Sequence, residues 1–199
     1  MEIKNIIFDF GGVLMDWDPR YMYRNVFDNE TEMEFFLENI CNSEWNVKQD
    51  AGRSFDEATE ELVLKFPKYE NQIRIYFSRW IEMIGGAIDE NVVLIEDLKD
   101  KYRLFGLTNW SAETFPLVFN EYPFFKELEG IVVSGTEKIV KPDASIYKLL
   151  LNRYGLTANE SLFIDDNKEN IIAANKLGFK TIHLSEKVNL KEEFKKLAL

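Results

Sequence analysis

The chain has 199 residues, 46% of them hydrophobic, and its 35 acidic against 24 basic residues give a net charge of −11. This charge, with no basic cluster, argues against a nucleic acid partner. No apolar stretch approaches the roughly 20 residues that cross a bilayer, and the start lacks the pattern of a secretory signal, so we expect a cytoplasmic protein with no membrane partner. The single cysteine, Cys41, excludes an internal disulfide and a cysteine-based zinc site.

The first predicted element is a buried strand over residues 6–8, with Asp9 at its carboxyl end and two glycines after it. The next segment, residues 19–79, has no alternating strand pattern and is predicted to be helical. Its clearest helix begins at Ser54, which is placed as an N-cap with Glu57 three residues later. This helix is expected to end at Pro67, and the other helices of the segment are expected over residues 21–27, 32–40 and 70–84.

From Gly85 and Gly86 onward, short apolar runs alternate with helical patterns. Strands that alternate with helices predict a parallel sheet covered on both faces. We therefore expect an α/β fold, a Rossmann-like doubly wound parallel sheet over residues 1–15 and 86–199, with an inserted all-helical cap domain over residues 16–85. The expected strands are RLFGLTN, GIVVSG, SLFIDD and KTIHL, and the expected helices lie near residues 90–99, 112–120, 144–154 and 169–177.

Polar residues of an unusual kind follow several of these strands. They are, in chain order, Asp9, Thr108, Asn109, Lys141, Asp165 and Asp166. Taken one by one, such residues can be turn or helix caps, and a lysine before a proline can be a plain loop residue. Two adjacent carboxylates after a buried strand repel each other unless a cation or hydrogen-bond donors compensate them, which favours a metal ion. Because the carboxyl ends of parallel strands share one edge of a sheet, we expect the whole set to meet there.

In this order, the segments DFGGV, LTNWS, VKPD and FIDDNKENI resemble the four motifs of the haloacid dehalogenase-like (HAD) hydrolases, a superfamily made up mostly of magnesium-dependent phosphatases. The helical insertion also lies where these enzymes carry a cap. The chain is most similar to a helical-cap subgroup that includes bacterial glucose-1-phosphate phosphatases and the phosphatase domain of soluble epoxide hydrolases. The resemblance implies a Mg²⁺-dependent phosphomonoesterase for small phosphorylated metabolites, with sugar phosphates as the expected substrates, in a monomer or homodimer.

The resemblance also implies roles for single residues. Asp9 is the expected nucleophile, which attacks phosphorus and forms an aspartyl-phosphate. Mg²⁺ is expected to bind Asp9, the backbone carbonyl of Gly11 and Asp166, while Asp165 orients a metal-bound water. Lys141 is expected to hold the phosphoryl oxygens and to keep Asp9 ionised. The other expected phosphate-binding residues are Thr108, Asn109 and Gly12.

The position two residues after Asp9 departs from the usual pattern. Most phosphatases of this family have an aspartate there that also acts as general acid and base, whereas Gly11 offers only its carbonyl. General acid catalysis typically contributes about 10²- to 10⁴-fold in rate. Three accounts are open: Asp16 or Asp18 supplies the proton, the substrate has a good leaving group, or the protein is a weak catalyst. Both aspartates can equally be solvated or capping residues at the start of the insertion.

Two other functions stay open. A 2-haloacid dehalogenase would use Asp9 on carbon without a metal, but Asp165 and Asp166 would repel the carboxylate of its substrate, and those enzymes usually have an aromatic residue where this chain has glycine. A catalytically weak member of the family that binds a phosphorylated ligand is the other alternative. We expect a structural role for His183, whereas Trp110 is close enough in sequence to the second motif to line the pocket.

Overall fold

The computed structural model describes residues 2–185 and 187–197. Residues 1, 186, 198 and 199, which include the ends of the expected core segments, lie outside the described residues. The strands are β1 (Asn5–Phe8), β2 (Met15–Trp17), β3 (Ile84–Ala87), β4 (Arg103–Thr108), β5 (Gly130–Val133), β6 (Ser161–Asp165) and β7 (Lys180–His183). The α-helices are α1 (Arg20–Tyr23), α2 (Glu30–Asn39), α3 (Ser43–Asp50), α4 (Phe55–Lys65), α5 (Glu70–Ser78), α6 (Asp89–Leu98), α7 (Phe115–Phe119), α8 (Ser134–Glu137), α9 (Ala144–Tyr154), α10 (Lys168–Lys176) and α11 (Leu190–Lys196). Short 3-10 helices cover Pro67–Tyr69, Trp80–Met83, Pro123–Glu127 and Ala158–Glu160.

The main sheet consists of five parallel strands in the order β5-β4-β1-β6-β7. Because β1 lies between β4 and β6, the chain builds the sheet outward from β1 in both directions. This is the topological switch point, where open α/β sheets bind their ligands. Every residue of β1 and β6 is buried, as in the central strands of parallel sheets. The expected Rossmann-like doubly wound core is confirmed.

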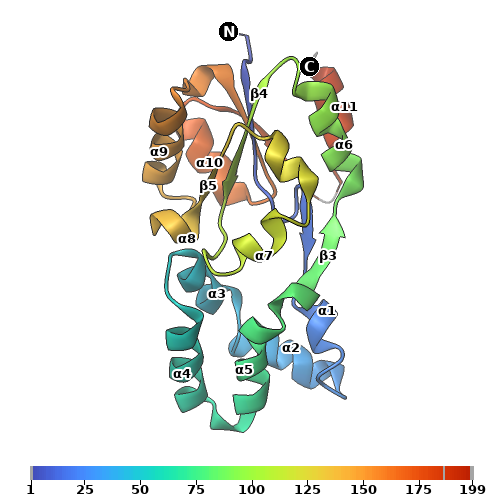
Figure 1. Ribbon diagram of the computed structural model, residues 1–199, viewed down its shortest axis with the longest axis vertical. Helices are drawn as coiled ribbons and strands as arrows, with labels where there is room; N and C mark the ends of the chain where they lie inside the picture. Colours follow the sequence, from blue (N-terminus) through green and yellow to red (C-terminus); the bar gives the residue numbers. More distant parts are fainter. Residues whose placement is uncertain (1, 186, 198–199) are drawn as a thin grey trace.

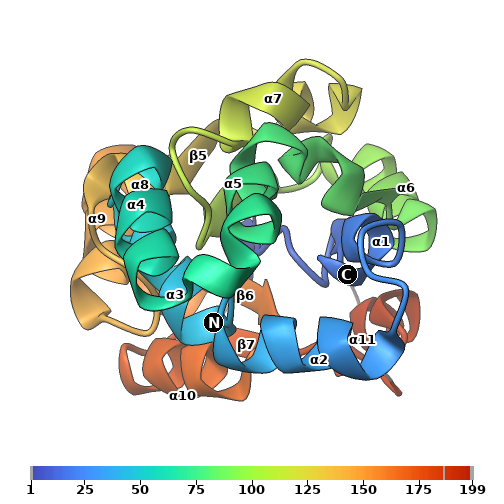
Figure 2. The ribbon, with the colours of Figure 1, turned by 90° about the horizontal axis from the view of Figure 1, so that it is seen from below.

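Side chains of the central strand alternate between the two faces of the sheet. Ile6 and Phe8 pack in the same hydrophobic cluster as residues of α6 and α11, whereas Ile7 packs with residues of α9 and α10. Figure 2 shows these two pairs of helices on opposite sides of the strands. Burial of an isoleucine or phenylalanine side chain stabilises the fold by about 1.5–3 kcal/mol. The sheet is therefore held from both faces, which keeps its edge rigid.

The cap lies below the sheet as a separate layer of helices, α1 to α5 (Figure 1). The predicted N-cap is confirmed, because the Ser54 hydroxyl accepts a hydrogen bond from the backbone N–H of Glu57 where α4 begins. The rings of Phe55 and Phe77 stack at a centroid distance of 4.7 Å and join α4 to α5. Buried aromatic contacts of this kind hold a small helical domain together.

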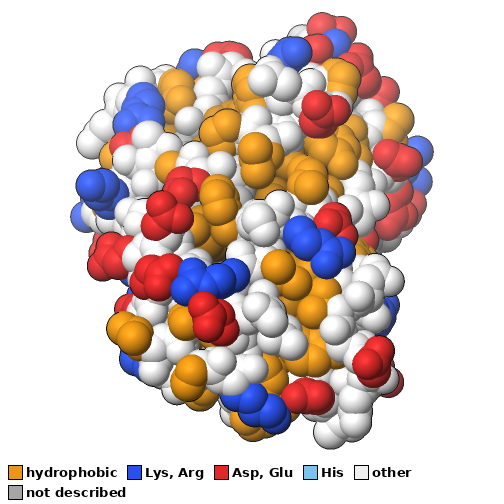
Figure 3. Space-filling model, turned by 60° about the horizontal axis from the view of Figure 1, so that its bottom comes forward, with side chains coloured by type: hydrophobic (Ala, Val, Ile, Leu, Met, Phe, Trp, Pro, Cys, Tyr) orange, Lys and Arg blue, Asp and Glu red, His pale blue; other side chains and the backbone are white. Residues whose placement is uncertain are grey.

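On its surface, the cap carries charges of both signs. Figure 3 shows acidic and basic side chains side by side on the lower face of the molecule. Arg74, for example, makes ion pairs with Glu60 and Glu70. Exposed pairs of this kind contribute little to stability, about 0–1 kcal/mol each.

The first helix of the insertion, expected over residues 21–27, is the shorter α1, which ends at Tyr23. The insertion also differs from its prediction in three other places. Helix α3 was not predicted, because its pattern is only weakly amphipathic and a buried Gln49 replaces an apolar residue. The helix expected over residues 70–84 ends at Ser78 and is followed by a 3-10 helix and β3. The third difference is that β3 pairs antiparallel with β2, so the insertion begins and ends in strand residues. Such short strands, far apart in the chain, leave no periodic signal.

The antiparallel ribbon of β2 and β3 joins the two layers. Both expected domain boundaries, after residue 15 and after residue 85, fall inside it. We propose that the ribbon is the link between a core of residues 1–15 and 86–199 and a cap of residues 16–85.

In the core, the predicted elements lie close to their expected positions. Helix α9 covers the expected range of residues 144–154. Helix α7 is shorter than expected and begins at Phe115, because Pro116 fits only the first turn of a helix. Among the helices of the described residues, none is long and apolar enough to cross a membrane.

Candidate active site

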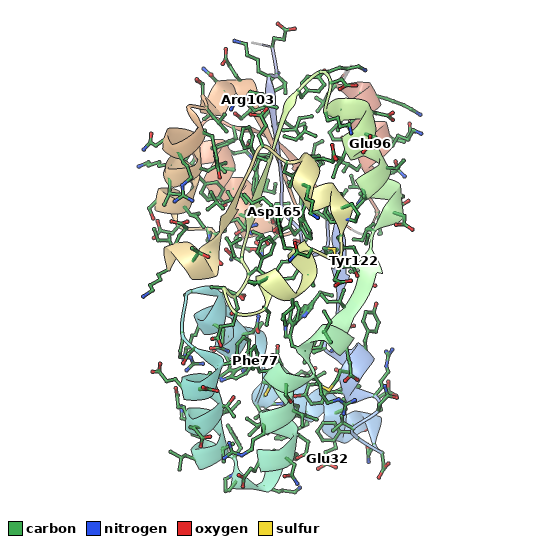
Figure 4. The ribbon with its side chains drawn as sticks, in the orientation of Figure 1. Glu32, Phe77, Glu96, Arg103, Tyr122 and Asp165 are labelled. Carbon is green, nitrogen blue, oxygen red and sulfur yellow. The ribbon has the colours of Figure 1, made fainter. Side chains whose placement is uncertain are left out.

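The site lies at the carboxyl ends of β1, β4 and β6. The registers of these strands match up to Phe8, so the next residue, Asp9, stands level with Leu107 of β4 and Asp165 of β6. The backbone N–H of Asp9 continues the ladder and donates to the carbonyl of Ile164 at 2.9 Å. Figure 4 shows Asp165 within the core, above the layer of the cap. Three neighbouring strands therefore present functional groups at one height.

Lys141 joins these three strands through its ammonium group. Its Nζ lies 2.9 Å from Asp9 Oδ2, 2.7 Å from Asp165 Oδ2 and 2.9 Å from the carbonyl oxygen of Leu107. The side chain is completely buried, and the three contacts match the three donors of an ammonium group. Burial lowers the pKa of Lys141, but the charges of Asp9 and Asp165 outweigh it and raise the pKa overall. The site therefore keeps a fixed positive charge.

Three carboxylates face this single ammonium group within the described residues. Asp9, Asp165 and Asp166 each offer an oxygen atom, and these atoms lie within 4.8 Å of one another. Burial raises the pKa of Asp9, and the carboxylates of Asp165 and Asp166 add to the rise while Lys141 opposes it. Burial and Asp165 likewise raise the pKa of Asp166. The cluster thus has an excess of negative charge that a divalent cation would neutralise, and oxygen atoms are the ligands that Mg²⁺ prefers.

Gly12 is required by the close approach of Asp166. A Cβ atom at this position would lie 2.5 Å from Asp166 Oδ2, and the backbone φ of +69° is one that residues other than glycine rarely adopt. Its N–H donates to the carbonyl of Met15. Gly12 was expected to bind phosphate, but here its amide is used in the turn, and its lack of a side chain makes room for the acid pair.

Asp165 is held by donors on both of its oxygen atoms. Besides Lys141, the side-chain Nδ2 of Asn170 lies 3.0 and 3.1 Å from the two oxygens, and the backbone N–H of Asn167 donates to Oδ1 at 2.8 Å. Asn170 is buried in the first turn of α10 and was not among the expected site residues. Its signal was available, since an asparagine in the first turn after the acid pair can reach back to it.

The two polar residues at the end of β4 have different surroundings. Thr108 is 1% exposed, and its hydroxyl has no hydrogen-bond partner among the described residues. A buried orphan hydroxyl of this kind suits a ligand oxygen. The side chain of Asn109 instead makes two hydrogen bonds to the backbone of Lys141. Its Oδ1 accepts from the N–H at 2.8 Å, and its Nδ2 donates to the carbonyl at 3.0 Å. Asn109 therefore positions the lysine.

The two expected proton donors are engaged away from the acid cluster. The hydroxyl of Tyr21 donates to Asp16 Oδ2 at 2.7 Å. Asp18 accepts from the backbone N–H of Arg20 at 2.9 Å and forms an ion pair with its guanidinium. Neither is among the described residues that line the cavity beside Gly11. The geometry thus leaves the role of general acid without a donor at Asp16 or Asp18.

A cavity of about 140 Å³ opens beside Gly11, between the core and the cap. Trp110, the expected pocket residue, lines it and contacts Trp80 of the cap at a ring-centroid distance of 5.7 Å. The aromatic lining residues are Trp17, Phe55, Trp80 and Trp110, and the polar ones include Asn46, Asp50, Ser111 and Thr114. The residues contributed by the cap were not predicted, because nothing in their local sequence indicates which of them faces the core.

His183 lies at the end of β7, next to the acid pair. Its Nε2 is 2.9 Å from the carbonyl oxygen of Asp166. The imidazole thus supports the backbone of the loop that carries the acid pair.

A sequence profile of the haloacid dehalogenase-like hydrolases matches residues 6–184. The chain belongs to this family. The match runs from β1 through the inserted helices to the end of β7. The expected resemblance to this family is therefore confirmed.

Relatives of the haloacid dehalogenase-like family match along almost the entire chain. Sesquiterpene phosphatase astK of Aspergillus oryzae is 26% identical over 98% of this chain and 96% of its own length. The D-ribitol-5-phosphate phosphatase of Bacteroides thetaiotaomicron is 22% identical over 96% of both chains. In fold, the chain is similar to a magnesium complex of a family enzyme from Bacteroides thetaiotaomicron, with a TM-score of 0.78 at 22% identity over 98% of this chain and 100% of the other.

Proposed function

We propose that the protein is a Mg²⁺-dependent phosphomonoesterase that hydrolyses small phosphorylated metabolites through an aspartyl-phosphate on Asp9. The observation that carries the proposal is the meeting of Asp9 and Asp166 with a buried ammonium group and with the orphan hydroxyl of Thr108 at one edge of the sheet. A carboxylate nucleophile, an oxygen-rich cation site and a phosphate-binding donor are what phosphoryl transfer requires. Two relatives that match the whole chain are named as phosphatases, which supports the same chemistry.

Each residue of the site would have its own role in this reaction. Asp9, the carbonyl of Gly11 and Asp166 would hold Mg²⁺, which when bound neutralises the phosphoryl group and the carboxylate that attacks it. Lys141 aims the Asp9 carboxylate and offers charge to the phosphoryl oxygens, and Thr108 donates to one of them. Asp165, held by Lys141 and Asn170, would orient a bound water.

We favour sugar phosphates as the substrates. The indole Nε1 of Trp17 is buried without a partner among the described residues, and Trp17 lines the cavity. A sugar hydroxyl can accept this hydrogen bond, and aromatic rings pack against the apolar faces of sugars. The D-ribitol-5-phosphate phosphatase of Bacteroides thetaiotaomicron supports this class.

An apolar alkyl or terpenyl monophosphate is a second candidate. Four aromatic side chains wall the cavity, and this favours an apolar leaving group as strongly as a sugar. The similarity to a sesquiterpene phosphatase supports it. A panel that contains glucose 1-phosphate, ribitol 5-phosphate and farnesyl monophosphate, assayed with Mg²⁺ and with EDTA, separates the two classes by kcat/KM.

The first test of the chemistry is Asp9→Asn in the purified protein. We expect phosphate release with Mg²⁺ in the wild type and its loss in the variant, because an amide cannot form the aspartyl-phosphate. Asp56→Asn, an exposed acid in the first turn of α4, is the matched control and should keep full activity. Metal-dependent turnover that persists in Asp9→Asn would contradict the assigned nucleophile.

The same preparation tests the two other functions. Halide release from 2-chloropropionate in EDTA would establish a metal-independent dehalogenase. Binding of phosphorylated compounds without any release of phosphate would establish a weak, ligand-binding member of the family. Each result excludes the phosphomonoesterase.

A further inference from the structure

The side chain that this chain lacks at Gly11 leaves open space. A Cβ atom placed on Gly11 would have nothing within 4 Å, and Gly11 forms part of the wall of the cavity between core and cap. A proton donor that acts here need not come from position 11. It can come from any wall that faces the same space, because a general acid only has to reach the leaving oxygen.

The facing wall carries Asp50, the last residue of α3 in the cap. Among the described residues that line this cavity, Asp50 is the only one with an acidic side chain. The backbone of Ser111, which lines the same cavity, hydrogen-bonds to the Asp50 carboxyl, and the charge of Lys141 also acts on it. Asp50 therefore lines the same cavity as Gly11, two residues after Asp9, although it comes from the other domain.

Contacts between cap and core fix Asp50 in this position. The Ser134 hydroxyl of α8 donates to the Asp50 carbonyl across the domain boundary at 2.6 Å. Within the cap, the amide of Asn46, one turn earlier on α3, donates to Asp50 Oδ2 at 3.2 Å. Five residues further along the chain, the Phe55 N–H donates to the Glu113 carboxylate of the core at 2.9 Å. Gly52 between them packs so closely that a Cβ would lie 2.9 Å from Lys138 Cγ. The loop that follows Asp50 is thus docked on the core at several points.

The protonation state of Asp50 suits proton transfer. Burial raises the pKa of its carboxyl to about 7, while a hydrogen bond from the Ser111 backbone and the charge of Lys141 hold it down. A group that titrates near neutral pH is present in both forms and can give and take a proton. Asp16 and Asp18 instead have partners of their own, the Tyr21 hydroxyl and the Arg20 guanidinium, and do not line this cavity among the described residues.

We propose that Asp50 of the cap is the general acid and base of the reaction and takes the place of the side chain missing at Gly11. The inference rests on the proposed phosphomonoesterase. In the first step Asp9 forms its bond to phosphorus, the bond from phosphorus to the leaving oxygen breaks, and the Asp50 proton moves to that oxygen. In the second step water attacks phosphorus, its proton returns to the Asp50 carboxylate, and the bond to Asp9 breaks to release phosphate.

Asp50→Asn tests the proposal by its dependence on the leaving group. We expect kcat/KM for the best sugar or alkyl phosphate of the panel to fall about 10²- to 10⁴-fold, because its alkoxide needs a proton. The fall should be less than about tenfold for p-nitrophenyl phosphate, whose nitrophenolate leaves without one. Asp56→Asn should change neither value. Equal losses on the two substrates, or no loss on either, would overturn the role of Asp50.

Restoring the acid on the other wall is a second, independent test. Gly11 does not have a positive φ, and its Cβ position is open, so Gly11→Asp fits while the backbone carbonyl stays in place. In the double variant Gly11→Asp, Asp50→Asn, we expect at least about a tenfold recovery of kcat/KM on the alkyl or sugar phosphate over Asp50→Asn alone, a part of the usual general-acid contribution. Absence of recovery in a double variant with the wild-type circular dichroism spectrum counts against the proposal.

The wild type supplies a measurement that needs no variant. If the leaving group receives a proton, kcat/KM changes little across a series of aryl and alkyl phosphates, and a steep dependence on leaving-group pKa would refute a proton donor altogether. Failure of the phosphomonoesterase itself looks different, because the wild type would then release no phosphate from any substrate. If the wild type is active and Asp50→Asn has the same activity, the proposed phosphomonoesterase function stands and only the role of Asp50 is refuted.

Discussion

Lys141 is the residue on which the geometry of the site depends. Its ammonium group ties together β1, β4 and β6 by contacting Asp9, Asp165 and the carbonyl of Leu107. Removing one partner of a buried ion pair typically costs about 3–5 kcal/mol. Substitution of Lys141 would therefore change stability and catalysis together, and a neutral neighbour is a better probe of the site.

Asn170 is that neighbour. We expect Asn170→Ala to leave the fold intact and to raise the Mg²⁺ concentration needed for half-maximal activity by about 10- to 100-fold, because Asp165 loses the amide that orients it. Activity measured against Mg²⁺ concentration checks this, with kcat at saturating Mg²⁺ changing much less. Asn175→Ala, later on the same helix, is the control. An unchanged activation curve would show that Asn170 has only a structural role.

Among the elements, the helices of the cap domain are stabilised by side-chain hydrogen bonds at their N-termini as well as by packing. The Ser54 hydroxyl caps α4, and the side chain of Asn42 caps α3 in the same way. Asp50 is the last residue of α3, and the loop docked on the core joins α3 to α4. The stability of these two helices therefore affects the position of Asp50. The ribbon of β2 and β3 connects this unit to the core.

Ser54→Ala should therefore lower the free energy of unfolding by a predictable amount. Loss of an N-cap typically costs about 1 kcal/mol, which corresponds to about 2–4 °C in melting temperature for a chain of this size. Thermal unfolding followed by circular dichroism measures the change, and Ser54→Asp, which keeps an acceptor for the Glu57 N–H, should melt near the wild type. If both variants have the same melting temperature, the hydrogen bond between Ser54 and the Glu57 N–H makes no contribution to stability.

The molecule as a whole combines an excess of negative charge with a cluster of three carboxylates, of which Asp9 and Asp165 are buried. In such a site the folded state gains from a cation that the unfolded chain does not bind. The aromatic contacts of the cap and the two hydrophobic layers of the core stabilise the rest of the fold independently of the metal. Metal binding should thus appear as added thermal stability.

We expect Mg²⁺ at about 100 times its dissociation constant to stabilise the protein by about 2.7 kcal/mol, and so to raise the melting temperature by about 5–10 °C over the value in EDTA. The increase should disappear in Asp166→Asn, which removes an expected ligand, and should remain in Asp56→Asn. Differential scanning fluorimetry gives the comparison. A shift of equal size in Asp166→Asn would place the cation elsewhere.

The amino-acid sequence by itself determined the sheet, the position of the insertion and the family. Residues 6–8, RLFGLTN and SLFIDD each contain a short apolar stretch of strand length, which is typical of a buried strand in a parallel sheet. The motif residues follow directly on these strands, so strand register alone brings Asp9 level with Asp165. Local chemistry also sufficed for the N-cap at Ser54.

Only the tertiary structure decided what lies across from Gly11. Asp50 is far from Asp9 in the chain and is the last residue of a helix with a weak pattern, and its place in the cavity comes from docking of the cap on Ser134 and Glu113. The pairing of β2 with β3 is equally non-local. Periodicity reports which face of an element is apolar, whereas the neighbour of a polar side chain depends on how whole domains pack.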